Sequence, residues 1–84
     1  MRRRRRHTVP TKLRAAFGRR LRELRRGRAL SQERLGARAQ LSGKFLGELE
    51  RGEKSPTLDT MARLARALGV TLARMVTDQG RVDE

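Results

Sequence analysis

Apolar residues recur at helical spacing along most of the chain. The first apolar face consists of Leu13, Phe17, Leu21 and Leu24, which are four, four and three positions apart and so lie on one side of a helix. No segment alternates polar and apolar residues with a period of two, and β-branched residues are sparse. The pattern over residues 13 to about 76 therefore predicts an all-α domain.

Capping residues divide this region into five predicted helices. Four of the predicted helices begin at a hydroxyl side chain that can accept a hydrogen bond from the backbone N–H groups of the first turn. These residues are Ser31, Ser42, Thr57 and Thr71. The fourth helix has an alternative start at Ser55, with Pro56 at its first helical position. Glycine suits the turn after a helix, and it follows three of the predicted helices at Gly27, Gly52 and Gly69.

Residues 31–52 predict two short helices joined by a tight turn. The apolar positions that pack this pair are Leu35, Ala39, Leu41, Leu46 and Leu49. Gly36 lies where the two helices must approach closely at a steep crossing angle, and a side chain larger than alanine there would push them apart. Such a rigid helix pair is what a reader of duplex DNA requires.

Charge divides the chain into three zones. Residues 1–12 form a basic arm with five consecutive arginines, residues 13–77 form the helical domain, and residues 78–84 form a polar tail that we expect to fray. The formal net charge is +13 over 84 residues, and 19 of the 22 basic residues are arginines. Arginine binds phosphate bidentately and stacks on bases, so this bias suits nucleic acid. A GC-rich coding sequence would produce the same excess.

Other function classes find little support in the composition. The chain has no cysteine and a single histidine, His7, so we expect no metal site and no cofactor. No apolar run approaches the roughly 18 residues of a membrane span, and we expect a cytoplasmic, nucleoid-associated protein of a bacterium or phage. No nucleophile–base pair is evident, so we expect no enzyme, and we expect no small-molecule effector because little chain lies outside the predicted helices.

The helix pair and its flanks resemble the phage-repressor/Cro-type (XRE-like, lambda-repressor-like) helix-turn-helix DNA-binding family. The resemblance spans roughly Phe17 to Val76, and its most telling pieces are residues 30–33, Leu46 with residues 49–52, residues 56–58 and residues 64–70. It implies a compact five-helix domain whose second helix lies across the DNA backbone and whose third helix, about residues 42–51, enters the major groove. It also implies a homodimer that regulates transcription by binding a palindromic operator.

The resemblance assigns roles along the recognition helix. The positions that match base-facing residues of the family are Gly43, Lys44, Gly47 and Glu48. Lys44 would donate to guanine O6 and N7, and Glu48 would accept from cytosine N4. The glycines are expected to face solvent, where they either let the backbone approach base edges or have no selected role. Phe45 suits either a thymine methyl or the edge of the core.

Phosphate contacts and one structural ion pair also follow from the resemblance. The positions that match the family's phosphate-facing stretches are Gln32, Ser42, Arg51, Lys54 and Ser55. The family pairs an acid at the place of Glu50 with an arginine at the place of Arg25, partly buried between the first and third helices. That pair would fix the angle of the recognition helix. One departure is Gln40, which stands where the family usually has glycine in a left-handed turn.

Two segments outside the helix pair have open roles. The arm either inserts arginines into the minor groove, adds sequence-independent attraction, or is incidental, and its arginines are Arg2, Arg3, Arg4, Arg5 and Arg6. The fifth helix carries Leu72, Met75 and Val76 at the other end of the domain. In proteins of the family, this end contacts the second subunit of the homodimer. These side chains form either a dimer interface or the edge of the monomer core.

The sequence therefore predicts a DNA-binding transcriptional regulator, and two alternatives from other classes stay open. One is a protein that coats nucleic acid through its arginines without reading sequence. Single-strand stacking is disfavoured because the only aromatic residues are Phe17 and Phe45. The other is an antitoxin-type protein-interaction module whose DNA binding is secondary.

Overall fold

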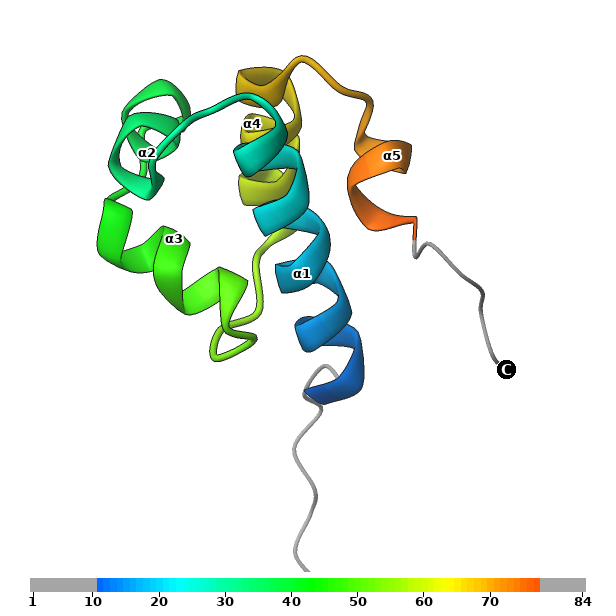
Figure 1. Ribbon diagram of the computed structural model, residues 1–84. Coiled ribbons are helices and arrows are strands. Elements are labelled where there is room, and N and C mark those ends of the chain that lie inside the picture. Colours follow the sequence, from blue (N-terminus) through cyan, green and yellow to red (C-terminus); the bar gives the residue numbers. More distant parts are fainter. Residues whose placement is uncertain (1–10, 78–84) are drawn as a thin grey trace, which may run out of the picture.

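The computed structural model describes residues 11–77, which form five helices and no strand (Figure 1). The helices are α1 (Thr11–Gly27), α2 (Gln32–Ala39), α3 (Gly43–Glu50), α4 (Leu58–Leu68) and α5 (Leu72–Val76). The all-α, five-helix prediction is confirmed for this part of the chain. The helix α1 begins two residues before the predicted boundary, while Arg2–Arg6 and residues 78–84 lie outside the described residues.

All four predicted capping side chains perform that function. The hydroxyl of each accepts a hydrogen bond from the backbone N–H three residues later, and the four residues are Ser31, Ser42, Thr57 and Thr71. Thr57 rather than Ser55 therefore starts α4. These caps satisfy N–H groups that have no partner within their own helix.

Within residues 11–77, two residues other than glycine adopt the left-handed backbone conformation. Gln40 has φ 61° and ends α2, as the family pattern predicts for this position. Ala29 has φ 55° in the turn that follows α1. We predicted the stop at Gly27, but Gly27 is the last residue of the helix and the reversal occurs at Ala29. Each left-handed residue costs about 1 kcal/mol because its Cβ crowds a carbonyl oxygen.

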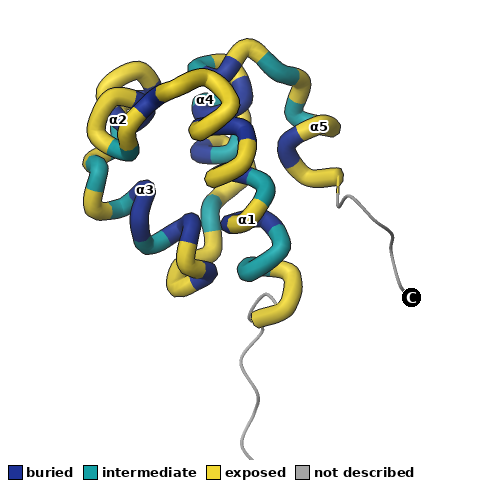
Figure 2. Tube along the Cα trace, viewed as in Figure 1, coloured by how far each residue is buried: buried dark blue, intermediate teal, exposed yellow. Residues whose placement is uncertain are grey.

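The core lies between α1 on one side and α2, α3 and α4 on the other, and α5 closes the end near α1 and α4 (Figures 1 and 2). Its fully buried side chains are Leu21, Leu35, Leu46, Leu49, Leu64 and Met75. They come from all five helices, so the core ties both helices of the helix pair to the rest of the domain. No helix within residues 11–77 has the length and apolar character to cross a membrane.

Gly36 sets the distance between α2 and the segment that leads into α3. A Cβ atom at this position would collide with the carbonyl oxygen of Leu41, and it would lie 3.2 Å from the carbonyl carbon of Ser42. These are backbone atoms that cannot turn away as a flexible side chain can. The predicted close approach at Gly36 is therefore confirmed, but the limit is stricter than we predicted, because even alanine is too large at this position.

Candidate nucleic-acid interface

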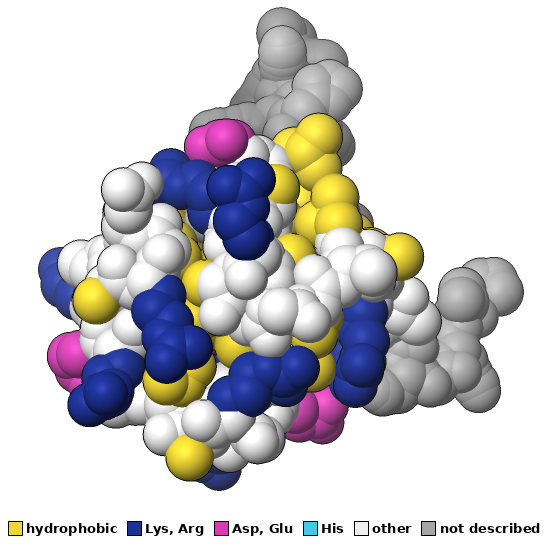
Figure 3. Space-filling model, turned by 90° about the horizontal axis from the view of Figure 1, so that it is seen from above, with side chains coloured by type: hydrophobic (Ala, Val, Ile, Leu, Met, Phe, Trp, Pro, Cys, Tyr) yellow, Lys and Arg dark blue, Asp and Glu magenta, His cyan; other side chains and the backbone are white. Residues whose placement is uncertain are grey.

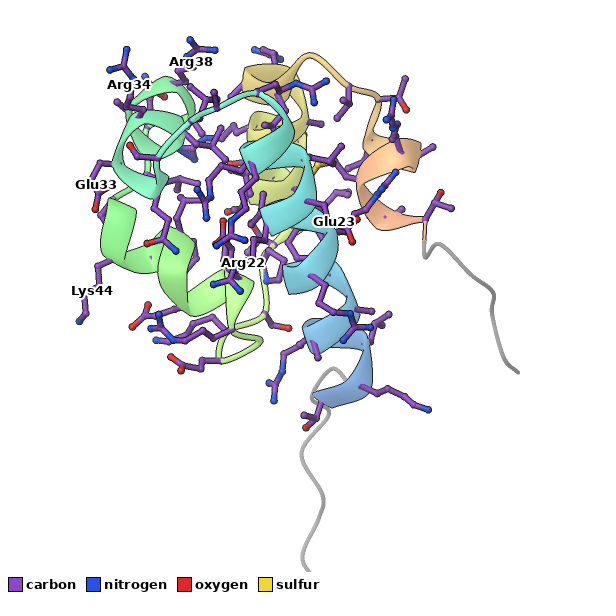
Figure 4. The ribbon with its side chains drawn as sticks, in the orientation of Figure 1. Arg22, Glu23, Glu33, Arg34, Arg38 and Lys44 are labelled. Carbon is purple, nitrogen blue, oxygen red and sulfur yellow. The ribbon has the colours of Figure 1, made fainter. Side chains whose placement is uncertain are left out.

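The helix α3 presents one fully projecting side chain near its N-terminal end. Lys44 has a side chain that is 85% exposed and points away from the body of the molecule (Figure 4). The cap residue Ser42 is exposed beside it, whereas Phe45 is half-buried and packs against the core. The first turn of α3 therefore offers Lys44 and Ser42 to solvent, and Phe45 belongs to the edge of the core.

The two glycines of α3 do not face solvent as we expected. Gly47 is buried, and a Cβ there would lie 3.1 Å from Nη1 of Arg51 and 3.4 Å from Oε1 of Gln32. Gly43 is half-buried against α2, with Glu33 Cγ 3.0 Å from the position of a Cβ. The expectation was wrong because it considered α3 alone, whereas α2 covers this side of the helix. The glycines let α2 and its side chains lie close to α3.

Glu48 is held between two lysines. Its carboxylate oxygens lie 4.0 Å from Nζ of Lys44 and 4.0 Å from Nζ of Lys54, and its side chain is 19% exposed. Lys44 comes from the same face of α3, one turn earlier, and Lys54 comes from the loop after the helix. The two ammonium groups offset the negative charge that Glu48 would otherwise bring toward a phosphate.

Arg51 and Glu53 form a second acid–base pair in this loop. Arg51 donates from Nε to Oε2 of Glu53 at 2.8 Å and from Nη2 to Oε1 at 3.3 Å. The hydrogen bond and the opposite charge raise the pKa of Arg51 and lower the pKa of Glu53. Both groups are exposed, so the pair exchanges readily with water or with a phosphate.

A buried network joins α1, α2 and α3 behind this surface. Arg25 donates from Nε to Oε2 of Glu50 at 2.6 Å and from Nη2 to Oε1 at 3.0 Å. Nη1 of Arg25 donates to the carbonyl oxygen of Leu30 at 2.8 Å. Gln32 donates from Nε2 to Oε1 of Glu50 at 3.1 Å. The side chain of Glu50 has no exposed surface, so its charge depends entirely on these partners.

The balance of forces keeps Glu50 ionised. Burial opposes its charge, but hydrogen bonds from Arg25 and Gln32 and attraction to Arg25 and Arg22 outweigh burial and lower the pKa of Glu50. The hydrogen bond with Glu50 raises the pKa of Arg25 in turn, against a smaller opposing effect of burial. The predicted pairing of Arg25 with Glu50 is thus present in the structure.

Arg22 is a member of this network that we did not predict from the sequence. Its Nε lies 3.6 Å from Oε1 of Glu50, and its side chain is 48% exposed as it extends from α1 toward α3 (Figure 4). Arg22 stands three residues before Arg25, so both lie on one side of α1. This three-residue spacing is the sequence feature that could have identified Arg22. It becomes informative only when the position of Glu50 beside both arginines is known.

The candidate phosphate contacts form a surface around the two ends of α3. Ser42 stands at the N-terminal end, and the loop after the helix exposes Arg51, Lys54 and Ser55. Gln32 is half-buried and uses its amide nitrogen for Glu50, which leaves its Oε1 near Gly47. The α2–α3 contact places Gln32 beside Gly47 of α3, whereas Ser55 lines a hollow together with Leu13 of α1 and Val76 of α5.

The predicted dimer residues divide between core and surface. Met75 has no exposed surface and belongs to the core, and Leu72 is half-buried against the core. This corrects the assignment of Met75 to an interface, because the side chain already packs inside the chain. Val76 is 50% exposed beside Leu13, which is 56% exposed. Between them lies a hollow of about 250 Å³ whose apolar lining residues include Leu13, Phe17, Pro56, Met61 and Val76.

Two short helices joined by a tight turn, with the first turn of the second helix exposed, are typical of helix-turn-helix DNA-binding domains. A model of the helix-turn-helix domain family matches residues 16–76. The chain therefore belongs to the helix-turn-helix domain family.

Relatives and solved structures agree with this assignment. The chain is 42% identical over 65 residues to the uncharacterized HTH-type transcriptional regulator y4dJ of Sinorhizobium fredii, a match that covers 77% of this chain and 84% of the relative. It is similar to the restriction-modification controller protein C.AhdI of Aeromonas hydrophila, with 37% identity, a TM-score of 0.73, and coverage of 74% and 94% of the two chains.

A phage repressor is also among the structural neighbours. The P22 c2 repressor, solved in complex with a synthetic operator, has a TM-score of 0.67 and 25% identity, and the match covers 71% of this chain and 91% of the repressor. The resemblance to phage-repressor/Cro-type domains is confirmed by these matches. The three similar proteins are a transcriptional regulator, a restriction-modification controller and a repressor.

Proposed function

We propose that this protein is a transcriptional regulator that binds a palindromic DNA operator as a homodimer, with α3 in the major groove. The observation that carries the proposal is the 85% exposed side chain of Lys44 at the leading end of α3, beside the exposed cap Ser42. A helix that enters the groove by its N-terminal end presents these positions to base edges.

Lys44 and Glu48 are proposed to read bases. In the free protein they lie 4.0 Å apart, one turn from each other on α3. On DNA, Lys44 donates to guanine O6 and N7, and Glu48 accepts from cytosine N4. The cost of bringing Glu48 near phosphates is reduced by Lys54, which stays 4.0 Å from its carboxylate. Gly43 and Gly47 act here by keeping α2 close, so they contribute shape rather than side-chain contacts.

Phosphate contacts are proposed at both ends of α3. Ser42 and the half-buried Gln32 contact phosphates at the N-terminal end of α3. Arg51, Lys54 and Ser55 contact phosphates at its C-terminal end. Arg51 must exchange Glu53 for a phosphate, which an exposed ion pair permits at little cost. The arm Arg2–Arg6, outside the described residues, is proposed to add minor-groove or sequence-independent attraction.

The proposed dimer interface is the apolar surface formed by the start of α1 and the end of α5. Leu13 and Val76 are about half exposed there, and a hollow of about 250 Å³ lies between them. Exposed apolar side chains around a hollow are suited to a second copy of the same surface, because a two-fold axis makes such a contact self-complementary. Leu72, the third residue that we predicted for this interface, begins α5 and is half-buried against the core. The two recognition helices of such a dimer read half-sites about one DNA turn apart.

Selection from random duplexes with the purified full-length chain, followed by footprinting, tests the proposal. A symmetric motif with two half-sites is expected. A flat selection profile, with similar affinity for every sequence at equal salt, would contradict it and support a nucleic-acid-coating role. Leu13→Glu together with Val76→Glu is expected to yield a monomer with weaker operator binding, and the exposed Leu58→Glu is the matched control that leaves the dimer intact.

A further inference from the structure

The exposed basic side chains differ sharply between two ends of the molecule. Around α3, four exposed basic side chains each lie within 4.0 Å of a carboxylate, namely Arg22, Lys44, Arg51 and Lys54. At the end formed by α2 and by the C-terminal ends of α1 and α4, five exposed arginines have no such partner among residues 11–77: Arg26, Arg28, Arg34, Arg38 and Arg66. We call these five residues the second basic surface.

The second basic surface points away from α3. Arg34 and Arg38 project from the outer side of α2 at the top of the view, whereas Lys44 projects from α3 at the lower left (Figure 4). Arg26 and Arg66 lie in the last turns of α1 and α4, which reach the same end of the molecule (Figure 1). Seen from above, basic side chains are spread over this end and the carboxylates lie at its rim (Figure 3).

Helix capping accounts for only part of this arrangement. Arg26, Arg38 and Arg66 occupy the last turns of their helices, where a cation is stabilised by the helix dipole. Arg34 lies in the first half of α2, and it stands one turn before Arg38. Two like charges at this spacing destabilise a helix by about 0.2–0.5 kcal/mol. A bound polyanion removes that repulsion.

The surface suits the phosphates of a duplex better than it suits a protein. Protein interfaces need an apolar centre, and the large apolar side chains exposed in the described part of the chain are Leu13, Leu58 and Val76. Leu13 and Leu58 lie at the opposite ends of α1 and α4 from the arginines, and Val76 ends α5. Arginines with no exposed large apolar side chain among them give sequence-independent binding that is driven by counterion release.

We propose that the second basic surface binds the backbone of a second DNA duplex, so that one protein bridges an operator and a separate DNA segment. The proposal rests on the proposed function, because α3 is taken to hold the first duplex. Arg28 donates from Nε to the carbonyl oxygen of Leu68 at 2.5 Å and from Nη1 to that of Leu24 at 3.4 Å, so it joins the ends of α1 and α4, and its Nη2 is the nitrogen we propose for a phosphate.

Capture of a labelled short operator by beads that carry a random-sequence duplex tests this proposal. The full-length protein is first saturated with operator, so its recognition helices are occupied. The wild type is expected to retain the labelled operator on the beads. Arg34→Gln with Arg38→Gln should lower retention on the order of tenfold, and should lower the log–log salt slope by about 0.9 for each phosphate that is no longer neutralised.

The matched control removes the same charge from elsewhere. Arg19→Gln with Arg74→Gln changes two exposed arginines of α1 and α5 that likewise have no ion pair among the described residues. The control is expected to capture like the wild type, and both double variants should bind free operator within about twofold of the wild type. No capture by the wild type, or equal capture by Arg34→Gln with Arg38→Gln, would overturn the proposal. Failure of the wild type to select an operator would instead contradict the proposed function.

Discussion

Arg25 donates two hydrogen bonds of 2.6 and 3.0 Å to Glu50, and these bonds join the last turn of α1 to the last residue of α3. The carboxylate has no exposed surface and the arginine side chain is 10% exposed. The guanidinium also holds the carbonyl of Leu30, just before α2. One planar group therefore fixes three segments, and the direction in which α3 projects depends on it.

Removal of the arginine should be costly. Arg25→Met leaves the carboxylate of Glu50 buried with only Gln32 and the more distant Arg22, and we expect a loss of about 3–5 kcal/mol in the free energy of unfolding. Arg25→Met with Glu50→Leu should recover most of this loss, because no unpaired charge remains. Urea unfolding measures both effects.

The exposed pair Arg63–Asp59 provides the control for this prediction. Its atoms lie 3.3 Å apart on α4, and the Asp59 side chain is 79% exposed. Arg63→Gln should change stability by less than about 1 kcal/mol. Similar losses of unfolding free energy for Arg25→Met and Arg63→Gln would show that the buried pair stabilises the protein no more than an exposed pair does.

Stability should depend on pH through Glu50. Because its pKa is lowered on folding, the ionised carboxylate stabilises the protein fully above the unfolded pKa of about 4.3, and this contribution is lost as pH falls toward the folded pKa. The gap in unfolding free energy between the wild type and Glu50→Gln should therefore narrow below about pH 4. Other carboxylates titrate in both proteins. A gap that stays constant from neutral to acid pH would refute the role of Glu50.

The left-handed residues are sites where stability can be gained. Ala29 and Gln40 have φ 55° and 61°, a conformation that glycine adopts without steric cost. Ala29→Gly and Gln40→Gly should each raise the free energy of unfolding, by at most about 1 kcal/mol. Thermal unfolding of both variants checks the direction, and a fall in the melting temperature would contradict it.

Two glycines should respond oppositely to alanine. At Gly36 the added methyl group meets the backbone carbonyl of Leu41, so Gly36→Ala should destabilise the protein by about 1–3 kcal/mol. At Gly27, within α1, nothing lies within 4 Å of the added atom, so Gly27→Ala should stabilise it by up to about 1 kcal/mol. Equal effects at the two sites would mean that the α2–α3 crossing is not set by Gly36.

Local chemistry explains what could be predicted from the sequence. A serine or threonine before an apolar face can satisfy the free N–H groups of the next turn, and this identifies Ser31, Ser42, Thr57 and Thr71 without any tertiary information. The position of Gly36 follows from the steep crossing that the helix pair requires. The ion pair between Arg25 and Glu50 came from the family resemblance, since 25 residues separate the two side chains.

Tertiary packing explains what could not be predicted. Gly47 looked exposed because α3 was considered as an isolated rod, yet Gln32 and Arg51 cover it. Met75 stands beside the exposed Val76 on a five-residue helix, and only the contact of α5 with the core separates their roles. The helix α1 includes Gly27 as its last residue, so the chain reverses two residues later, at Ala29.

The proposed contact between the first turn of α3 and base edges can be measured at Lys44. Binding of the wild type and Lys44→Gln to the selected operator, and to versions with one base pair changed in each half-site, should be compared at fixed salt. We expect Lys44→Gln to lose about 1–3 kcal/mol on the operator and to discriminate less at one guanine. Equal losses on every duplex, with base preferences unchanged, would contradict the claim and reduce Lys44 to a phosphate contact.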